Sequence, residues 1–288
     1  MNNISCIGLV LNTNKKKAYV IAQKVISWCQ NKNIEILMEE KAASRMNKEK
    51  LKATYQEMKD KAEMVILFGG DGTFLYTSRH FIGIEIPILG INLGKLGFLT
   101  EIETEELEKT LKRIYRRDYT IEKRMLLKTN VRRQEELIYD NFALNDIVVN
   151  RGGNAKMVKI QLYINDEFVN SYRADGLILA TPTGSTAYNL SAGGPIVNPQ
   201  IRAIIVTPIC PHTLYVRPMV ISEREEVKII ISGDSDGMKI TADGRDTHNL
   251  QDKDQIIIKA SRKSISMVKF SEKTFYNILH EKMRSGMV

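Results

Sequence analysis

The chain contains few of the residues that build metal centres and disulfide scaffolds. Its 288 residues include three cysteines and four histidines. The cysteines form no CxxC pair and the histidines are widely separated, so we expect no zinc site and no set of protein metal ligands. An odd number of unpatterned thiols is typical of a protein from a reducing compartment.

Long apolar runs and a secretion signal are also missing. No stretch approaches the roughly 20 apolar residues that a transmembrane helix requires. The N-terminus lacks the basic segment of a signal peptide, and the apolar stretch at residues 4–11 has the length of a strand. We therefore expect a cytoplasmic protein with no membrane partner.

A concentrated basic surface is absent as well. The formal net charge is +8 and the pI is about 9.2. The basic residues are dispersed along the chain and are not gathered with interleaved aromatic residues. This pattern suits a small polyanionic ligand, and we expect no nucleic-acid partner.

Two common nucleotide-binding motifs are excluded by spacing. Gly90-Ile91-Asn92-Leu93-Gly94-Lys95 has one residue too few between its glycines for a Walker A loop, and Leu96 follows where a Ser or Thr should bind magnesium. No GxGxxG follows a predicted strand, and no HExxH occurs. The chain is therefore neither a P-loop protein nor a Rossmann dehydrogenase.

The first dense feature that is present is Gly69-Gly70-Asp71-Gly72-Thr73. It follows a continuous apolar run at residues 64–68, which is typical of a parallel strand covered on both faces. Ligands of open parallel sheets bind beyond the carboxyl ends of the strands, and glycines there let a ligand approach the backbone. Thr73 is predicted to cap a following helix whose free N–H groups favour phosphate.

Asp71 is the unexpected member of this motif, because a carboxylate repels phosphate. Phosphoryl transfer needs positioning, charge neutralisation and a group that orients or deprotonates the nucleophile. Asp71 suits the role of that base. The alternative is a tight turn in which Asp71 only hydrogen-bonds local N–H groups.

The second dense feature covers residues 175–195, which are rich in Gly, Ser and Thr. Hydroxyl groups and accessible amides hydrogen-bond ribose, phosphate or an amide, and Tyr188 offers an aromatic face for a base or a nicotinamide ring. A long polar loop between strands is the alternative, although it leaves Asp175 and Tyr188 unexplained.

The pattern of elements changes along the chain. Residues 4–11, 18–29 and 34–38 read as strand, helix and strand, and further strands are predicted at 86–91 and near Phe98. From about residue 125, short β-rich runs separated by turns predict a sandwich-like domain. We expect an α/β nucleotide-binding domain with a parallel sheet at 1–124, an all-β substrate domain at 125–268 and a C-terminal helix at 269–288.

Taken together, these motifs resemble the bacterial NAD kinases of the ATP-NAD kinase family. The motifs that carry the resemblance are Gly69-Gly70-Asp71-Gly72-Thr73, residues 90–100, Asn145-Asp146, residues 181–191, Cys210-Pro211-His212-Thr213-Leu214, Arg217-Pro218 and Asp243-Gly244. Phosphofructokinases and the diacylglycerol and sphingosine kinases share the first motif. Residues 90–100 and 183–188 resemble NAD kinases in particular.

The resemblance implies an enzyme that transfers the γ-phosphoryl group of ATP to the 2′-hydroxyl of the adenosine ribose of NAD, giving NADP. We expect a divalent metal, Mg²⁺, because nucleotide phosphates require one. The resemblance implies as well a homodimer or homotetramer, and a C-terminal helix that returns to the first domain.

The resemblance also implies roles for individual residues. Asp71 is the proton acceptor, with Gly72 beside it at the substrate, and Asn145 and Asp146 hold the adenosine. The remaining dinucleotide-binding positions are Lys156, Arg173, Asp175, Thr186, Ala187, Tyr188, Asn189, Leu190, Ser191 and Arg245.

Two further positions have open interpretations. The family usually has Gln where this chain has Arg245, so the residue either meets the ligand as a cation or pairs with a nearby aspartate. His212 lies in a family motif near the substrate phosphate, and a structural turn residue is the alternative.

Two other functions remain open from the sequence. One is a lipid kinase of the same superfamily, acting on a substrate such as diacylglycerol. The other is a non-catalytic regulator that binds a dinucleotide, against which the carboxylate of Asp71 counts.

Overall fold

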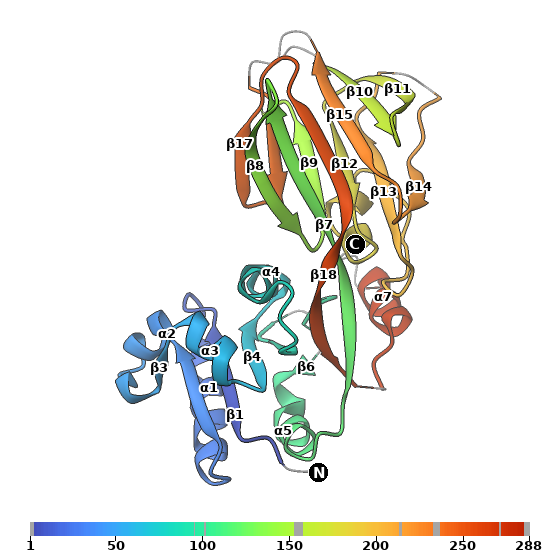
Figure 1. Cartoon of the computed structure of the whole chain (residues 1–288). Helices are drawn as coiled ribbons and strands as arrows, with labels where there is room; N and C mark the ends of the chain where they lie inside the picture. The colour runs from blue at the N-terminus through green and yellow to red at the C-terminus, as the bar shows by residue number, and fades with distance from the viewer. Residues whose placement is uncertain are drawn as a thin grey trace. The chain divides into compact units, whose positions relative to one another are not determined.

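The computed structural model describes residues 3–94, 96–100, 102–152, 158–212, 215–232, 237–270 and 272–284. The chain divides into two compact units. Unit 1 contains Met1–Lys123 and Ile265–Met287, and unit 2 contains Arg124–Ser264. In Figure 1 the first 123 residues run from blue to green, and the segment that rejoins unit 1 is red.

Unit 1 is built on a parallel sheet. Its strands are β1 (Cys6–Leu11), β2 (Glu35–Glu39), β3 (Lys52–Ala53), β4 (Met64–Gly69), β5 (Ile88–Asn92) and β6 (Ile102–Glu103). They pair in parallel in the order β6-β5-β4-β1-β2-β3. Every residue of β1, β4 and β5 is buried, which explains why these strands are continuous apolar runs. The predicted parallel sheet is confirmed.

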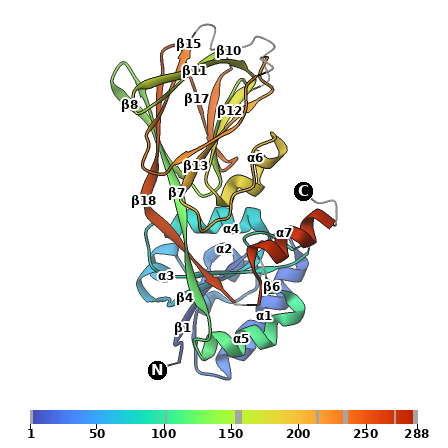
Figure 2. The same ribbon diagram turned by 90° about the vertical axis from the view of Figure 1, so that its right-hand side faces the viewer.

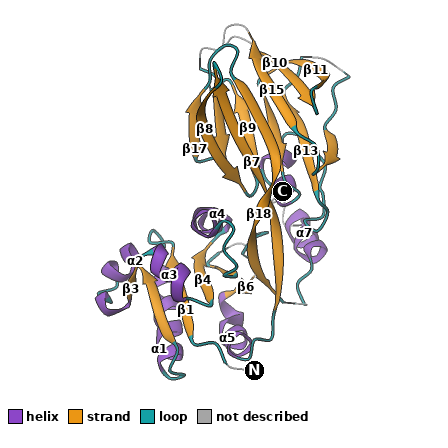
Figure 3. Cartoon of the chain, viewed as in Figure 1, coloured by secondary structure: helices purple, strands orange, loops and turns teal. Residues whose placement is uncertain are grey.

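Helices accompany this sheet, as Figure 3 shows in purple. They are α1 (Lys16–Gln30), α2 (Glu40–Arg45), α3 (Tyr55–Lys61), α4 (Asp71–Ser78), α5 (Leu107–Tyr115) and α7 (Phe275–Arg284), with 3₁₀ turns at Glu49–Leu51, Arg79–Phe81 and Thr104–Glu106. Helices α1 and α5 lie side by side (Figure 2), where the rings of Trp28 and Tyr115 meet edge to face with centroids 5.9 Å apart. The C-terminal helix α7 belongs to unit 1, as expected, and its Phe275 ring lies 6.2 Å from that of Phe98.

Unit 2 consists mostly of strands (Figure 3). One sheet contains β7 (Thr120–Arg133), β8 (Glu136–Ala143), β10 (Val158–Ile164), β11 (Glu167–Ala174), β15 (Val227–Ser232) and β18 (Gln255–Lys269). The other contains β9 (Asp146–Asn150), β12 (Gly176–Ala180), β13 (Ala203–Ile209), β14 (Met219–Ser222), β16 (Lys239–Ala242) and β17 (Asp246–Asn249). Both sheets contribute to one apolar core that includes Ile160, Ile229, Leu177 and Val206. Unit 2 is therefore the expected β-rich domain, and the unit boundaries fall within β7 and β18.

Two local predictions are wrong. Phe98 is not in a strand, because its backbone N–H group binds a carboxylate instead of a neighbouring strand. Thr73 does not cap α4: the helix begins at Asp71, with Gly70 in the N-cap position, and Thr73 lies within its first turn. The Oγ1 atom of Thr73 accepts a hydrogen bond from Asn12 at 3.3 Å. No helix among the described residues is long and apolar enough to cross a bilayer.

Candidate functional site

Asp71 is the first residue of α4, directly beyond the carboxyl end of the buried strand β4. The turn between them depends on glycine, since a Cβ atom on Gly69 would lie 2.3 Å from Oγ1 of Thr73. Gly70 has an extended backbone, and a Cβ atom there would meet no atom within 4 Å. The sequence therefore places this carboxylate at the sheet edge where ligands of parallel sheets bind.

The Asp71 carboxylate is held by the segment 97–100, which we call the 97–100 loop. Oδ2 accepts the N–H of Phe98 at 2.9 Å. Oδ1 accepts the N–H groups of Leu99 at 3.1 Å and Thr100 at 3.2 Å, and the Thr100 hydroxyl at 3.0 Å. A Cβ atom on Gly97 would lie 2.0 Å from Oδ1, so the loop approaches this closely only with glycine there.

These contacts join two sequence motifs into one structure. The donors are 27 to 29 residues from Asp71, so the alternative of a purely local turn does not describe them. A carboxylate offers about four acceptor positions, and Oδ1 already receives three donors. Oδ2 receives one, which leaves it the oxygen with room for another hydrogen bond.

A second aspartate makes an equivalent set of contacts in unit 2. Asp243 is buried, has a φ of 50° and leads into a turn at Gly244. Its Oδ2 accepts the N–H of Leu144 at 2.9 Å, and its Oδ1 accepts the N–H groups of Asn145 at 2.7 Å and Asp146 at 3.2 Å. The late Asp-Gly motif therefore fixes the backbone of the Asn145-Asp146 pair.

Asp146 is buried, with 5% of the residue exposed. Burial raises the pKa of its carboxyl group to about 7, and the negative charge of Asp243 adds to the rise. No described residue hydrogen-bonds this carboxyl group. The raised pKa favours the neutral acid, which donates a hydrogen bond, over the carboxylate, which only accepts.

The block at residues 181–191 lies against the same pair. The N–H of Thr181 donates to the Asn145 carbonyl at 2.8 Å, and the Thr181 hydroxyl donates to the Leu144 carbonyl at 2.5 Å. A Cβ atom on Gly184 would lie 2.1 Å from the Asn145 carbonyl oxygen. The structure thus brings Asn145, Asp146 and the block together in unit 2.

Within the block, the side chains separate into two groups. Ser185 and Asn189 are fully buried; the Asn189 amide donates to the Ser185 and Pro195 carbonyls at 3.1 Å and accepts the Thr207 hydroxyl at 2.6 Å. These contacts give Asn189 a role in shaping the block, and its predicted contact with ligand stays a prediction. Tyr188 is 44% exposed in the short helix α6 (Tyr188–Ser191), which follows the 3₁₀ turn Thr183–Thr186. Partly accessible as well are Thr186, Ala187, Leu190 and Ser191.

Other predicted binding residues lie at the opposite end of β12. Asp146 pairs with Ala180, whereas Asp175 precedes Gly176, about 16 Å away along the strand at 3.2–3.4 Å per residue. Asp175 forms an ion pair with Arg151 at 2.9 Å, and the N–H of His212 donates to the Arg173 carbonyl at 2.9 Å. Lys156 lies outside the described residues.

Arg245 is exposed in the turn after Asp243, and its N–H donates to the Ala242 carbonyl at 3.1 Å. This backbone hydrogen bond does not test the predicted contact of the Arg245 side chain with a ligand. Among the described residues no group of three His, Cys, Asp or Glu side chains is arranged to hold a metal ion.

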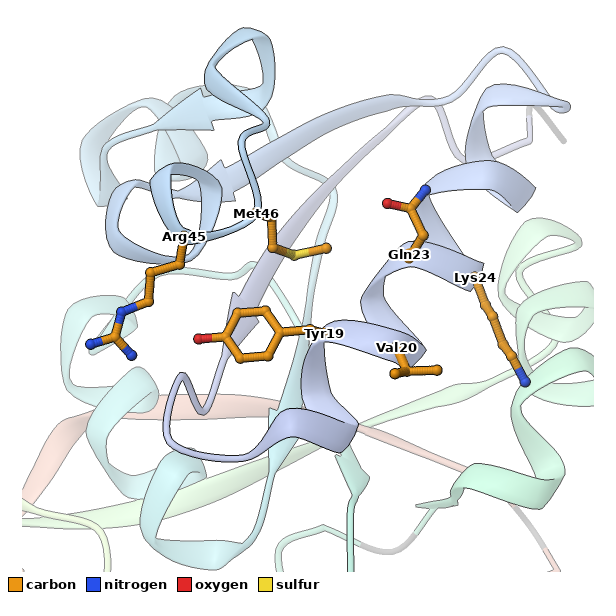
Figure 4. Close-up of a pocket in the computed structure, with 6 residues that line it drawn as sticks. All are labelled: Tyr19, Val20, Gln23, Lys24, Arg45 and Met46. Carbon is orange, nitrogen blue, oxygen red and sulfur yellow. The ribbon is translucent and has the colours of Figure 1, made fainter.

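A separate pocket lies in unit 1. Figure 4 shows its lining, with four side chains from α1, one from the last residue of α2 and one from the residue that follows it: Tyr19, Val20, Gln23, Lys24, Arg45 and Met46. It contains none of the predicted site residues.

Sequence reasoning missed the supporting roles of Thr100 and Asp243. Each lies inside a recognisable motif, but its partners are remote in sequence: Thr100 is 29 residues from Asp71, and the donors to Asp243 are 97 to 99 residues away. The positive φ favoured by Asp-Gly signalled a turn at Asp243, and nothing in the pattern signalled what its carboxylate binds.

Comparison with known proteins covers both units. The model of the ATP-NAD kinase N-terminal domain matches residues 7–119, and that of the ATP-NAD kinase C-terminal domain matches residues 144–270. An NAD kinase of Caldanaerobacter subterraneus subsp. tengcongensis is 42% identical over 277 residues, covering 96% of this chain and 98% of that protein. An NAD kinase of Moorella thermoacetica is 39% identical over 280 residues, covering 97% and 89%.

Two solved structures have the same fold. A yeast NADH kinase complexed with NADH superposes with a TM-score of 0.90 at 25% identity, covering 98% of this chain and 88% of that one. An NAD kinase from Archaeoglobus fulgidus in complex with ATP gives a TM-score of 0.77 at 26% identity, covering 97% and 99%. These matches favour neither a lipid kinase nor a non-catalytic regulator. With both domain models matched and curated relatives 39% to 42% identical over nearly the whole chain, this protein belongs to the ATP-NAD kinase family.

Proposed function

We propose that this chain transfers the γ-phosphoryl group of ATP to the 2′-hydroxyl of the adenosine ribose of NAD, giving NADP. The observation that carries the proposal is the Asp71 carboxylate beyond β4, with the 97–100 loop on one side of it and an open acceptor position on Oδ2. A positioned base of this kind takes a proton from an attacking hydroxyl as the bond to phosphorus forms.

The binding roles are part of the same proposal. Asn145 and Asp146 hold the adenosine, since their backbone is fixed by Asp243 and the Asp146 carboxyl is left for a ligand. The exposed ring of Tyr188 contacts the dinucleotide, together with Gly72, Thr186, Ala187, Leu190 and Ser191. Lys156, Arg173, Asp175 and Arg245 are proposed to contact it as well, on the strength of the family resemblance.

The proposal also includes a metal ion, a cellular location and an oligomeric state. Mg²⁺ bound to the ATP phosphates neutralises charge during transfer. The unpatterned cysteines, typical of a reducing compartment, support a cytoplasmic enzyme, and the family resemblance supports a homodimer or homotetramer.

The decisive experiment incubates the purified chain with ATP, Mg²⁺ and NAD and measures NADP with an NADP-specific dehydrogenase. NADP formation that requires both ATP and NAD supports the proposal. Phosphorylation of diacylglycerol without NADP formation would point to a lipid kinase, and binding of NAD without consumption of ATP would point to a regulator. Parallel reactions with NADH and with polyphosphate define the acceptor and the donor.

A further inference from the structure

Thr100 makes more contacts with the proposed base than any other described residue. It gives Asp71 Oδ1 both its backbone N–H at 3.2 Å and its hydroxyl at 3.0 Å. The side chain is fully buried, so its hydroxyl is not shared with bulk solvent. A hydrogen bond to a charged acceptor is shorter and stronger than a neutral one.

The Thr100 hydroxyl is itself held from the other side. The buried amide of Asn92, at the end of β5, donates from Nδ2 to Thr100 Oγ1 at 3.3 Å and to the Thr100 carbonyl at 3.4 Å. Asn92 Oδ1 accepts the N–H of Gly94 at 2.8 Å, which fixes the orientation of the amide. Since Asn92 donates to Oγ1, the hydroxyl proton of Thr100 is directed to Asp71.

The result is an asymmetric carboxylate. Three donors converge on Oδ1 and one on Oδ2. The two oxygens of a carboxylate are chemically equivalent, so the donors fix the plane of the group and the place of its remaining acceptor position. A partial rotation of that plane about the Cβ–Cγ bond would break the bond with the Thr100 hydroxyl. The side chain of Thr100 therefore helps to fix where an acceptor position is left for a substrate.

We propose that Thr100 is a positioning residue for the phosphoryl transfer: its hydroxyl, oriented by Asn92, fixes the Asp71 carboxylate so that Oδ2 receives the proton of the attacking ribose hydroxyl. The inference rests on the proposed function, in which Asp71 is the proton acceptor. It adds a residue that acts through Asp71 and touches neither NAD nor ATP.

The test compares Thr100→Val, which removes the hydroxyl at nearly constant shape, with Thr100→Ser, which keeps it. We expect Thr100→Val to lower kcat about 10- to 100-fold, the worth of a hydrogen bond to a charged group, while KM for NAD and for ATP changes less than about twofold. Thr100→Ser should restore kcat to within about threefold of the parent chain.

Thr77→Val is the matched control. Thr77 is also fully buried in unit 1, on α4, and its Oγ1 has no hydrogen-bond partner among the described residues. The same loss of a buried hydroxyl should therefore leave kcat unchanged. Thermal unfolding of each variant reports its folding, and Thr100→Ala replaces Thr100→Val if valine prevents folding.

A double-mutant cycle separates positioning from general destabilisation. If Thr100 acts through Asp71, adding Thr100→Val to Asp71→Ala lowers kcat less than about twofold further. The inference is overturned if Thr100→Val lowers kcat by the same factor in the parent chain and in Asp71→Ala, or if Thr100→Val alone keeps the kcat of the parent chain. In either case, a large loss of kcat in Asp71→Ala still supports the proposed function. A parent-like kcat in Asp71→Ala would overturn the role of Asp71 and the role of Thr100 with it.

Discussion

Asp71 in unit 1 and Asp243 in unit 2 use their carboxylates in the same way and differ in their surroundings. Each accepts three consecutive backbone N–H groups from a distant segment. Asp71 opens a helix and is half-buried, whereas Asp243 is buried in a β-turn at positive φ. Asp71 also binds a hydroxyl, and Asp243 faces a second carboxyl group, that of Asp146.

The difference indicates which aspartate is available for chemistry. Burial and a nearby acidic group suit Asp243 to hold the backbone of the Asn145-Asp146 pair. Partial exposure at the carboxyl edge of a parallel sheet suits Asp71 to meet a substrate while it holds the 97–100 loop. The same local arrangement therefore serves a structural role in unit 2 and suits the catalytic role that we propose for Asp71 in unit 1.

The sharpest test of this contrast is Asp71→Asn against Asp243→Asn. An amide accepts no proton, so Asp71→Asn should lower kcat by roughly two to four orders of magnitude, measured as NADP formation at saturating ATP and NAD. The Nδ2 atom of the new asparagine would also face the N–H of Phe98 and could not accept its hydrogen bond. We therefore expect some loss of thermal stability as well. A comparable fall in kcat for Asp243→Asn would erase the distinction between the two residues.

Asp243→Asn should act first on stability. In the variant, an amide nitrogen would replace one carboxylate oxygen that accepts backbone N–H groups. The loss of such a hydrogen bond to a charged group should lower the free energy of unfolding by about 2 to 3 kcal/mol, measured by urea denaturation of the whole chain. The control is Glu136→Gln, at an exposed position of the same unit, which should change stability by less than about 0.5 kcal/mol. Equal effects of both changes would refute the proposed backbone role.

Gly97→Ala tests whether the close approach of the 97–100 loop matters. The new Cβ atom would lie 2.0 Å from Asp71 Oδ1 and 2.4 Å from Thr100 Oγ1, and such overpacking costs about 1 to 3 kcal/mol. We expect kcat to fall roughly tenfold as the carboxylate is displaced. Gly94→Ala is the matched control, since a Cβ atom there meets nothing within 4 Å, and kcat values that match between the two would argue against the mechanism.

The last expected effect is the pH dependence of stability in unit 2. The Asp146 carboxyl has a pKa of about 7 in the folded chain against an ordinary value of 3.8, so the folded state binds its proton more tightly. Stability should therefore fall as pH rises from about 4 to about 7, by at most about 1.4 kcal/mol per pH unit. Denaturant unfolding at several pH values measures this slope, and Asp146→Asn should flatten it. An unchanged slope in the variant would assign it to other groups.

Sequence patterns located most of the elements and the chemistry-bearing residues, because both depend on local features. Continuous apolar residues predicted β1 and β4, and helical spacing predicted α1. The glycines around Asp71 placed the carboxylate at a strand end. The error at Phe98 arose because an apolar segment has the composition of a strand even when its N–H groups bind a side chain elsewhere.

By itself the sequence determined the α/β and β-rich units, the family and the identity of the candidate base, since these follow from periodicity and from motifs that are contiguous in the chain. Only the tertiary structure decided that the 97–100 loop binds Asp71, that Asp243 binds the backbone of residues 144–146, and that Asn189 is buried. These outcomes depend on hydrogen bonds between residues far apart in the chain. Such bonds form only when folding brings a buried donor to the one acceptor that satisfies it.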